Sequence, residues 1–332
     1  MDLLTHAATG LFLSRAGLKQ WTPRATPILI LAALAPDVDI VAAAGGSLSY
    51  LHYHRHLTHS LMAAPVMAVL PVLMVRAAGG KAVRLAGAYL AALIGVASHL
   101  LLDLTNIYGI RLLLPFSGEW LRLDLTSVID LWIWGALALG IGAPFVGRLV
   151  GSEITSGSVR EAHHGRGSAI VALAFLVFYN CGRGVLHARA VATLESREYQ
   201  LTAPLRVAAL PDPANPLRWK GLAETRDFYA VADLNLAGDF DPTRALIFHK
   251  PEGDPALDAT RRTPAFQQFL DFSQFPLWRI LPVPQPESGR LVQAMDLRFG
   301  TPLAPGFVVG ALLDAQLRPV RTSFQWLPAR PR

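Results

Sequence analysis

Long apolar runs dominate the first 190 residues of the chain and are missing from the remainder. Residues 85–102 (LAGAYLAALIGVASHLLL) contain no Asp, Glu, Lys or Arg and have His99 as their only histidine, and residues 168–182 carry no charge. Residues 128–150 are apolar except for one charge near each end. Because about 20 apolar residues cross the hydrocarbon core of a bilayer, these three runs are predicted to be membrane-spanning helices.

Three further runs, at residues 3–18, 26–44 and 60–75, are shorter or interrupted by polar residues and prolines. Taken alone, each could be a buried core helix. Beside three longer spans, we interpret them as short or half-inserted membrane helices. Residues 1–190 are therefore predicted to form an all-α membrane helical bundle of about six helices.

Residues 196–332 have a different pattern. Short, partly alternating β-prone runs such as DFYAVADLNLAG and LVQAMDLRFG are separated by proline-rich turns, and TPAFQQFLDFS is predicted to be one helix. This part is predicted to be a smaller β-rich or α+β soluble domain.

The charges predict a membrane orientation. If the six helices alternate in direction, the first, third and fifth loops are basic, whereas His6, the HRHLTHS segment and most acidic residues of the first 150 residues lie at the opposite face. The positive-inside rule places the basic loops in the cytoplasm. We therefore expect a multi-pass protein of the inner (plasma) membrane, with the polar cluster and the C-terminal domain on the extracytoplasmic side.

Composition narrows the possible functions. Of 332 residues, 52% are hydrophobic and only 16% are charged, and the formal net charge of +6 comes without a dense basic stripe, so we expect no nucleic-acid partner. The single cysteine, Cys181, excludes a cysteine-based zinc cluster. A metal site would have to use His, Asp and Glu. The first 20 residues lack the features of a cleaved signal peptide and are expected to remain in the mature protein.

Two motifs place carboxylates where a metal could bind. His99 and Asp103, in SHLLLDLTN, are four residues apart and share one helix face, so they could chelate a divalent ion or form a buried hydrogen-bonded pair. An ionisable pair in a membrane helix favours a functional role. Asp37 and Asp39, in APDVD, could bind a cation, although either could also be a turn or capping residue.

The segment YLHYHRHLTHS, residues 50–60, carries four histidines. Neighbouring imidazoles on one turn cannot all converge on one ion, so we expect one or two ligands here, with Arg55 available to bind an anion such as phosphate. His6, taken alone, could be structural. Asp124 and Asp130 lie on the same predicted face as the histidines, and Asp124 could instead cap a helix.

These motifs, in this order and spacing, resemble those of the YdjM-like, LexA-regulated membrane-bound metal-dependent hydrolases. The resemblance rests on His6 with Gly10, on PDVD at 36–39, on HRHLTHS at 54–60 and on SHLLLDLTNIYG at 98–109, and it covers residues 1–190. SHLLLD is also distantly similar to the helical ligand pair of the zinc-dependent phospholipase C and P1-nuclease group.

The resemblance implies a metal-dependent hydrolase of phosphoesters, with a lipid-linked substrate and membrane lipids as partners. The predicted metal ligands are His6, Asp37, His59, His99 and Asp103, together with His54. Asp39 is the predicted general base with Asp130 in reserve, and Arg55 would stabilise phosphoryl charge. Zinc is the expected divalent ion, with manganese or iron as alternatives. Two other classes stay open: a non-enzymatic membrane protein with a structural metal or His–Asp network, and an ion transporter.

Overall fold

A computed structural model describes residues 1–79, 83–154, 165–283 and 289–326. The contacts divide the chain into two compact units. The first contains residues 1–38, 55–188 and 211–218, and the second contains residues 39–54, 189–210 and 219–332. The hydropathy pattern did not indicate that residues 39–54 group with the C-terminal part of the chain, or that residues 211–218 group with the helices.

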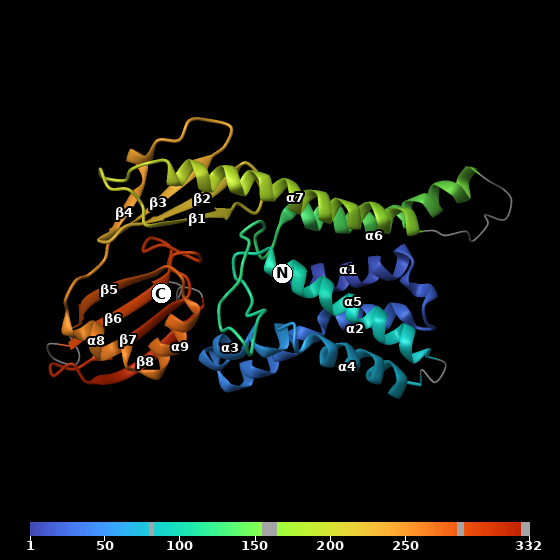
Figure 1. The fold of residues 1–332 in the computed structure, drawn as a ribbon, viewed down its shortest axis with the longest axis horizontal. Coiled ribbons are helices and arrows are strands. Elements are labelled where there is room, and N and C mark those ends of the chain that lie inside the picture. The colour runs from blue at the N-terminus through green and yellow to red at the C-terminus, as the bar shows by residue number, and fades with distance from the viewer. Residues whose placement is uncertain (80–82, 155–164, 284–288, 327–332) are drawn as a thin grey trace. The chain divides into compact units, whose positions relative to one another are not determined.

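All six apolar runs contain a helix, and these helices build the first unit (Figure 1). They are α1 (Leu3–Ala16), α2 (Ala25–Leu34), α4 (Ala64–Ala77), α5 (Leu85–Leu104), α6 (Leu131–Ile154) and α7 (Arg166–Glu195), the last of which continues into the second unit. Short 3-10 segments lie between them: η1 (Leu18–Gln20), η2 (Ala35–Gly45) and η3 (Leu57–His59).

Local chemistry sets several helix ends. The Asp2 carboxylate accepts hydrogen bonds from the backbone N–H groups of Leu4 and Thr5 and so caps α1. Asp130 does the same for α6 through the N–H groups of Trp132 and Ile133. Pro36 follows the last turn of α2, where the chain tightens into η2, because a proline has no backbone N–H to continue the α-helical hydrogen bonds.

Two glycines let α1 and α5 approach α2 closely. A Cβ on Gly10 would lie 2.5 Å from the Leu29 carbonyl oxygen, and one on Gly95 would lie 2.8 Å from the Cβ of Ala32. Neither site has room for a larger residue. The close packing fixes the position of His99 on α5 against the end of α2.

Two apolar clusters form the core of the first unit. One joins α2, α4 and α5 through residues such as Ile28, Ala68 and Val96. The other joins α1, α6 and α7 through Phe12, Leu137 and Leu176. At one end of the bundle, Arg24 donates to the Ala78 carbonyl and Arg166 donates to the Ala16 carbonyl.

Among the described residues, three helical stretches are long and apolar enough to cross a membrane: Ala25–Gly45, Leu85–Leu104 and Arg166–Glu195. Ser47–His59 and Ala64–Ala77 form a fourth only if this pair, bent by 92°, counts as one span. The expected six spans are therefore not confirmed. For α1 the reason is length: at 1.5 Å per residue, its 14 residues extend about 21 Å, less than the ~30 Å hydrocarbon core.

The second unit contains two four-stranded sheets, with strand orders β1-β2-β3-β4 and β5-β6-β7-β8. The first holds β1 (Arg206–Pro211), β2 (Arg218–Glu224), β3 (Phe228–Asn235) and β4 (Leu246–His249), with η4 (Pro242–Arg244) before β4. The second holds β5 (Pro276–Val283), β6 (Gly289–Asp296), β7 (Val308–Leu313) and β8 (Pro319–Gln325), and its neighbours pair antiparallel. The expectation of a β-rich or α+β C-terminal part is confirmed.

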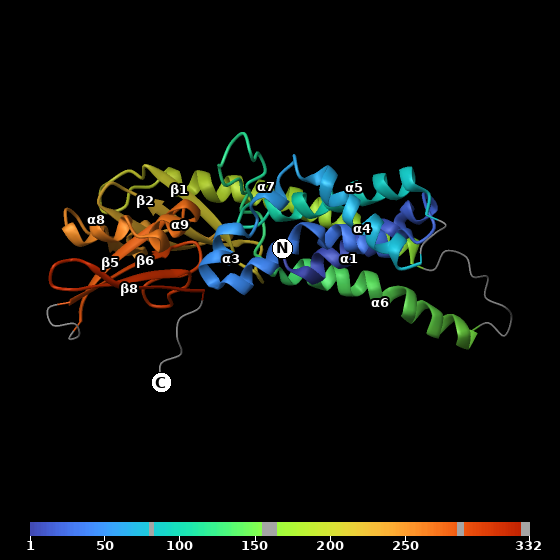
Figure 2. The same ribbon diagram turned by 90° about the horizontal axis from the view of Figure 1, so that it is seen from below.

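Three helices pack against the second sheet. Helices α8 (Pro255–Arg261) and α9 (Pro264–Phe272) contact β6, β7 and β8 (Figures 1 and 2). Helix α3 (Ser47–Tyr53), from the N-terminal half of the sequence, contacts α9 and β8, and Ser47 donates to the Phe324 carbonyl. These contacts explain why residues 39–54 group with this unit.

The loop at residues 211–218 is held by the helical unit through its backbone carbonyls. Ser127 donates to the Pro211 carbonyl, the Trp132 indole to the Ala214 carbonyl, and Arg183 to the carbonyls of Pro216 and Leu125. The β1–β2 connection is thereby part of the first unit.

Candidate metal centre

His99 and Asp103 lie one turn apart on α5, and both side chains are fully buried. His99 Nδ1 lies 2.7 Å from the Ala33 carbonyl oxygen at the end of α2. A carbonyl only accepts, so Nδ1 carries the proton and the lone pair of a neutral His99 is on Nε2. His99 Nε2 lies 3.3 Å from Asp103 Oδ2.

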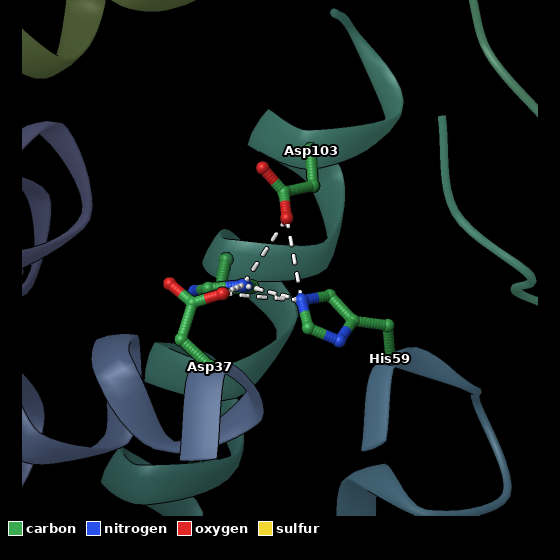
Figure 3. A group of neighbouring side chains, drawn as sticks. Asp37, His59 and Asp103 are labelled. Atoms are coloured by element: carbon green, nitrogen blue, oxygen red, sulfur yellow. Dashed lines mark hydrogen bonds and ion pairs between the residues drawn. The ribbon is translucent and has the colours of Figure 1, made fainter. Parts of the chain in front are cut away.

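Two further elements bring side chains to the same point. Asp37 comes from η2 and His59 from η3, and Figure 3 shows the side chains of Asp37, His59 and Asp103 directed toward one another. His59 Nε2 lies 3.1 Å from His99 Nε2, 3.5 Å from Asp37 Oδ1 and 3.4 Å from Asp103 Oδ2. The four ligand atoms all lie within 4.8 Å of one another.

These distances fit a divalent metal ion. Zinc binds imidazole nitrogen and carboxylate oxygen at about 2.0–2.2 Å, so two ligands of a tetrahedral ion lie roughly 3.3–3.5 Å apart. The separation of 3.1 Å between the Nε2 atoms of His59 and His99 and that of 3.7 Å between His99 Nε2 and Asp37 Oδ1 bracket this value. The hydrogen-bonding capacity of these atoms also favours a metal. His59 Nε2 can carry one proton, and this proton cannot serve His99 Nε2 and two carboxylate oxygens at once, whereas a cation could contact all of them. Asp103 Oδ2 is buried without a hydrogen-bond partner among the described residues.

The other Asp103 oxygen, Oδ1, faces a separate set of groups. The Arg55 guanidinium donates to it at 2.9 Å and to Asn106 Oδ1 at 3.0 Å. His6 Nε2 lies 3.3 Å from it, and the Met1 amino group also contacts it. The His6 ring stacks on the His99 ring with centroids 3.8 Å apart. His6 therefore adjoins the four-residue cluster.

The remaining predicted site residues are not part of this group of four. His54 and Asp39 belong to the second unit, where His54 Nδ1 and Asp39 Oδ1 are 3.0 Å apart. Asp130 caps α6 and accepts two 3.1 Å hydrogen bonds from the Tyr179 hydroxyl. Burial raises the pKa of the Asp130 carboxyl, and its hydrogen bonds oppose that change.

Three groups at the centre carry roles that the sequence did not predict. Asn106 holds Arg55, the Tyr108 ring lies under its guanidinium at 4.8 Å, and the Ala33 carbonyl sets the His99 tautomer. The i, i+3 spacing of Asp103 and Asn106 could have indicated that Asn106 lies beside the centre. A backbone carbonyl leaves no trace in a sequence.

The helical unit, its membrane character and this cluster agree with a known family. Residues 1–190 match the family described as YdjM inner membrane protein. The chain belongs to the YdjM family. It is therefore a membrane protein, and the metal-binding potential of its His/Asp cluster lies within the YdjM region.

Beyond the YdjM region, residues 255–330 match a family described as YfhP C-terminal alpha/beta plait domain, which covers α8, α9 and β5–β8. A Bacillus subtilis (strain 168) protein named "Uncharacterized protein YfhP" is 28% identical over 144 residues. That match covers 40% of this chain and 43% of the relative, so it spans less than half of either. No solved structure matches the chain.

Proposed function

We propose that this YdjM-family chain is a membrane-bound metal-dependent hydrolase of phosphoesters, with zinc as the metal and manganese or iron as alternatives. The observation that carries the proposal is the convergence of Asp37, His59, His99 and Asp103 at ligand spacing, with too few protons to satisfy their facing atoms. A bound divalent ion would supply a hydroxide nucleophile by lowering the pKa of its water from ~15.7 to about 7.

The burial of the four side chains suggests how water and substrate enter. His59, His99 and Asp103 are fully buried, whereas the Asp37 side chain is 13% exposed. We propose that Asp37 lines the entrance. His6, stacked on His99, is the fifth proposed ligand.

The contacts of Arg55 support a positioning role. Its guanidinium already donates to Asp103 and Asn106 and lies over Tyr108, so it holds the Asp103 carboxylate in place. We propose this role in place of direct contact with a phosphoryl group. Asp39 remains the proposed general base, and Asp130 is better suited to capping α6.

Metal content tests the centre. Wild type, His99→Ala and Asp103→Ala are purified and their bound metal is measured by elemental mass spectrometry, with His52→Ala as the matched histidine control. We expect at least a tenfold loss in the two cluster variants and no change in the control. Equal metal content in all four proteins would refute the ligand assignment.

Activity tests the reaction. A phosphodiester chromogen and phospholipid vesicles are offered to the protein loaded with zinc, manganese or iron. We expect hydrolysis by wild type, loss in His99→Ala, and loss in Asp39→Asn with its metal retained. Metal binding without hydrolysis under any of these conditions would favour a structural role.

One observation favours that structural alternative. Asp103 joins α5 to Arg55, His6 and His59 in a fully buried network that could hold the helices together, with or without a metal. For an ion transporter, ionisable groups deep inside the spans are expected. The cluster instead uses residues at the ends of α2 and α5 and before α4.

The orientation is part of the proposal. The basic residues of the loops after α1, α4 and α6 support a cytoplasmic location for that end of the bundle. The metal centre and the C-terminal domain would then face the extracytoplasmic side.

A further inference from the structure

A long apolar groove follows α6 and α7 in the helical unit. Its volume is about 690 Å³, which is within the range of ligand-binding pockets. The lining comes from one face of α6, between Leu131 and Ala143, and one face of α7, between Ser168 and Phe175, with Ala214 at one end. No lining residue carries a charge.

Small residues on α6 create the hollow. Gly135, Ala136, Gly140 and Ala143 recur on the groove face, where larger side chains would fill it. A Cβ on Gly135 would meet no atom within 4 Å, so the space beside it is open. A Cβ on Gly140 would lie 2.8 Å from the Phe12 ring, so α6 rests on α1 at that point.

The exposed residues of the groove and the tryptophan at its end indicate that it faces the membrane. Helix α7 is long and apolar enough to span a membrane, and the groove residues Leu139 and Val171 are 74% and 68% exposed. At the Ala214 end, the half-exposed Trp132 donates its indole N–H to the Ala214 carbonyl. Tryptophans are enriched where hydrocarbon meets water.

The length of the groove matches one leaflet. Residues 131–143 rise by roughly 18 Å along α6, slightly more than half of the ~30 Å hydrocarbon core. An extended apolar chain entering at the Trp132 end would lie along the whole groove.

We propose that this groove binds one acyl chain of a bilayer phospholipid. The absence of charged residues from its lining means that the site recognises the chain and leaves the headgroup in the interface. This site is separate from the metal centre and does not rest on the proposed hydrolase activity.

Photo-crosslinking tests the proposal. Phospholipids with a diazirine near the end of one acyl chain are incorporated into vesicles with wild type, Gly135→Leu, Gly135→Ala and the control Gly184→Leu. Gly184 lies on the opposite side of α7, and its added Cβ would also meet no atom within 4 Å. Labelled peptides are mapped by mass spectrometry, and unchanged elution and metal content show that each variant is folded.

We expect labelling within residues 131–143 and 168–175 in wild type and Gly184→Leu, at least a fivefold decrease in Gly135→Leu, and an intermediate decrease in Gly135→Ala. Phosphatidylethanolamine and phosphatidylglycerol probes should label these peptides equally within twofold. Unchanged labelling in Gly135→Leu would overturn the proposal, as would a tenfold headgroup preference. Loss of a protein dimer in Gly135→Leu, with lipid labelling unchanged, would assign the groove to a second copy of the chain.

Discussion

The Asp103 carboxylate has two oxygens with different partners. Oδ2 faces the imidazole nitrogens of His59 and His99, and Oδ1 accepts from Arg55. Arg55 thus neutralises one side of a fully buried carboxylate and leaves the other side for a cation. Such a division of roles depends on Arg55 being held by Asn106.

Replacing Arg55 with methionine should destabilise the protein. The substitution leaves the Asp103 charge buried without its guanidinium, and removing one partner of a buried ion pair costs about 3–5 kcal/mol. Arg76→Met, at an exposed position on α4, is the control and should have little effect. Chemical unfolding in detergent micelles measures both, and an Arg55→Met protein as stable as the control would contradict the assigned ion pair.

The pH dependence of stability should reveal Lys220 in the second unit. Burial lowers the pKa of the Lys220 amine from 10.5 to about 8, partly offset by Asp296. Between those pH values the unfolded chain binds the proton and the folded chain does not, so this contribution to stability rises with pH. The full size of this contribution is on the order of 3 kcal/mol.

The measurement compares wild type with Lys220→Met from pH 7 to pH 10, with Lys19→Met as the control. The stability difference between wild type and Lys220→Met should grow in favour of wild type as the pH rises. A difference that stays constant or shrinks would show that the amine has no lowered pKa.

Residue spacing explains which parts of the centre could be predicted. The i, i+4 spacing of His99 and Asp103 predicts a shared helix face, and in the structure both side chains belong to the metal-binding cluster. His54 and Asp39 could not be placed in this way, because residues 39–54 group with the C-terminal sheets through α3. That grouping depends on contacts more than 200 residues away, such as Ser47 with Phe324.

At the scale of elements, the close approach of α5 to α2 aligns His99 with the Ala33 carbonyl. Gly95→Ala should therefore destabilise the bundle by about 1–3 kcal/mol, because its Cβ would lie 2.8 Å from that of Ala32. Gly182→Ala on α7 has open space and should be neutral or slightly stabilising, since alanine favours helices. Melting temperature and metal affinity should both fall for Gly95→Ala, and a neutral result there would contradict the packing.

The contacts of Arg183 give α7 a second structural role. Arg183 is 1% exposed and donates to the Leu125 and Pro216 carbonyls, which joins the 211–218 loop to the helices. Arg183→Met should expose that loop to proteases at least tenfold faster, whereas Arg189→Met, at an exposed position on the same helix, should not. Equal digestion of the two variants would mean that the loop is held without Arg183.

At the scale of the whole molecule, each of the six apolar runs contains a helix, but hydropathy missed α3 and could not give the number of spans. Runs with similar composition differ in helix length, because Pro36 ends α2 near the site and Pro65 begins α4 only after the η3 turn. The β-rich character of the C-terminal part was predictable from alternation. The contact of residues 211–218 with the helices was not, because it uses backbone carbonyls.

The basic loops predict which side of the membrane each part of the chain faces, and cysteine labelling checks it. In a Cys181→Ser background, single cysteines replace Lys19, His52 or Leu201, and intact spheroplasts are treated with a membrane-impermeant maleimide. The cysteines at 52 and 201 should be labelled at once, and the one at 19 only after permeabilisation, because the loop after α1 is basic.

Labelling of position 19 in intact spheroplasts would reverse the orientation. Labelling of 52 without 201 would place an odd number of membrane crossings between them and so exclude a shared side for residues 39–54 and the C-terminal sheets.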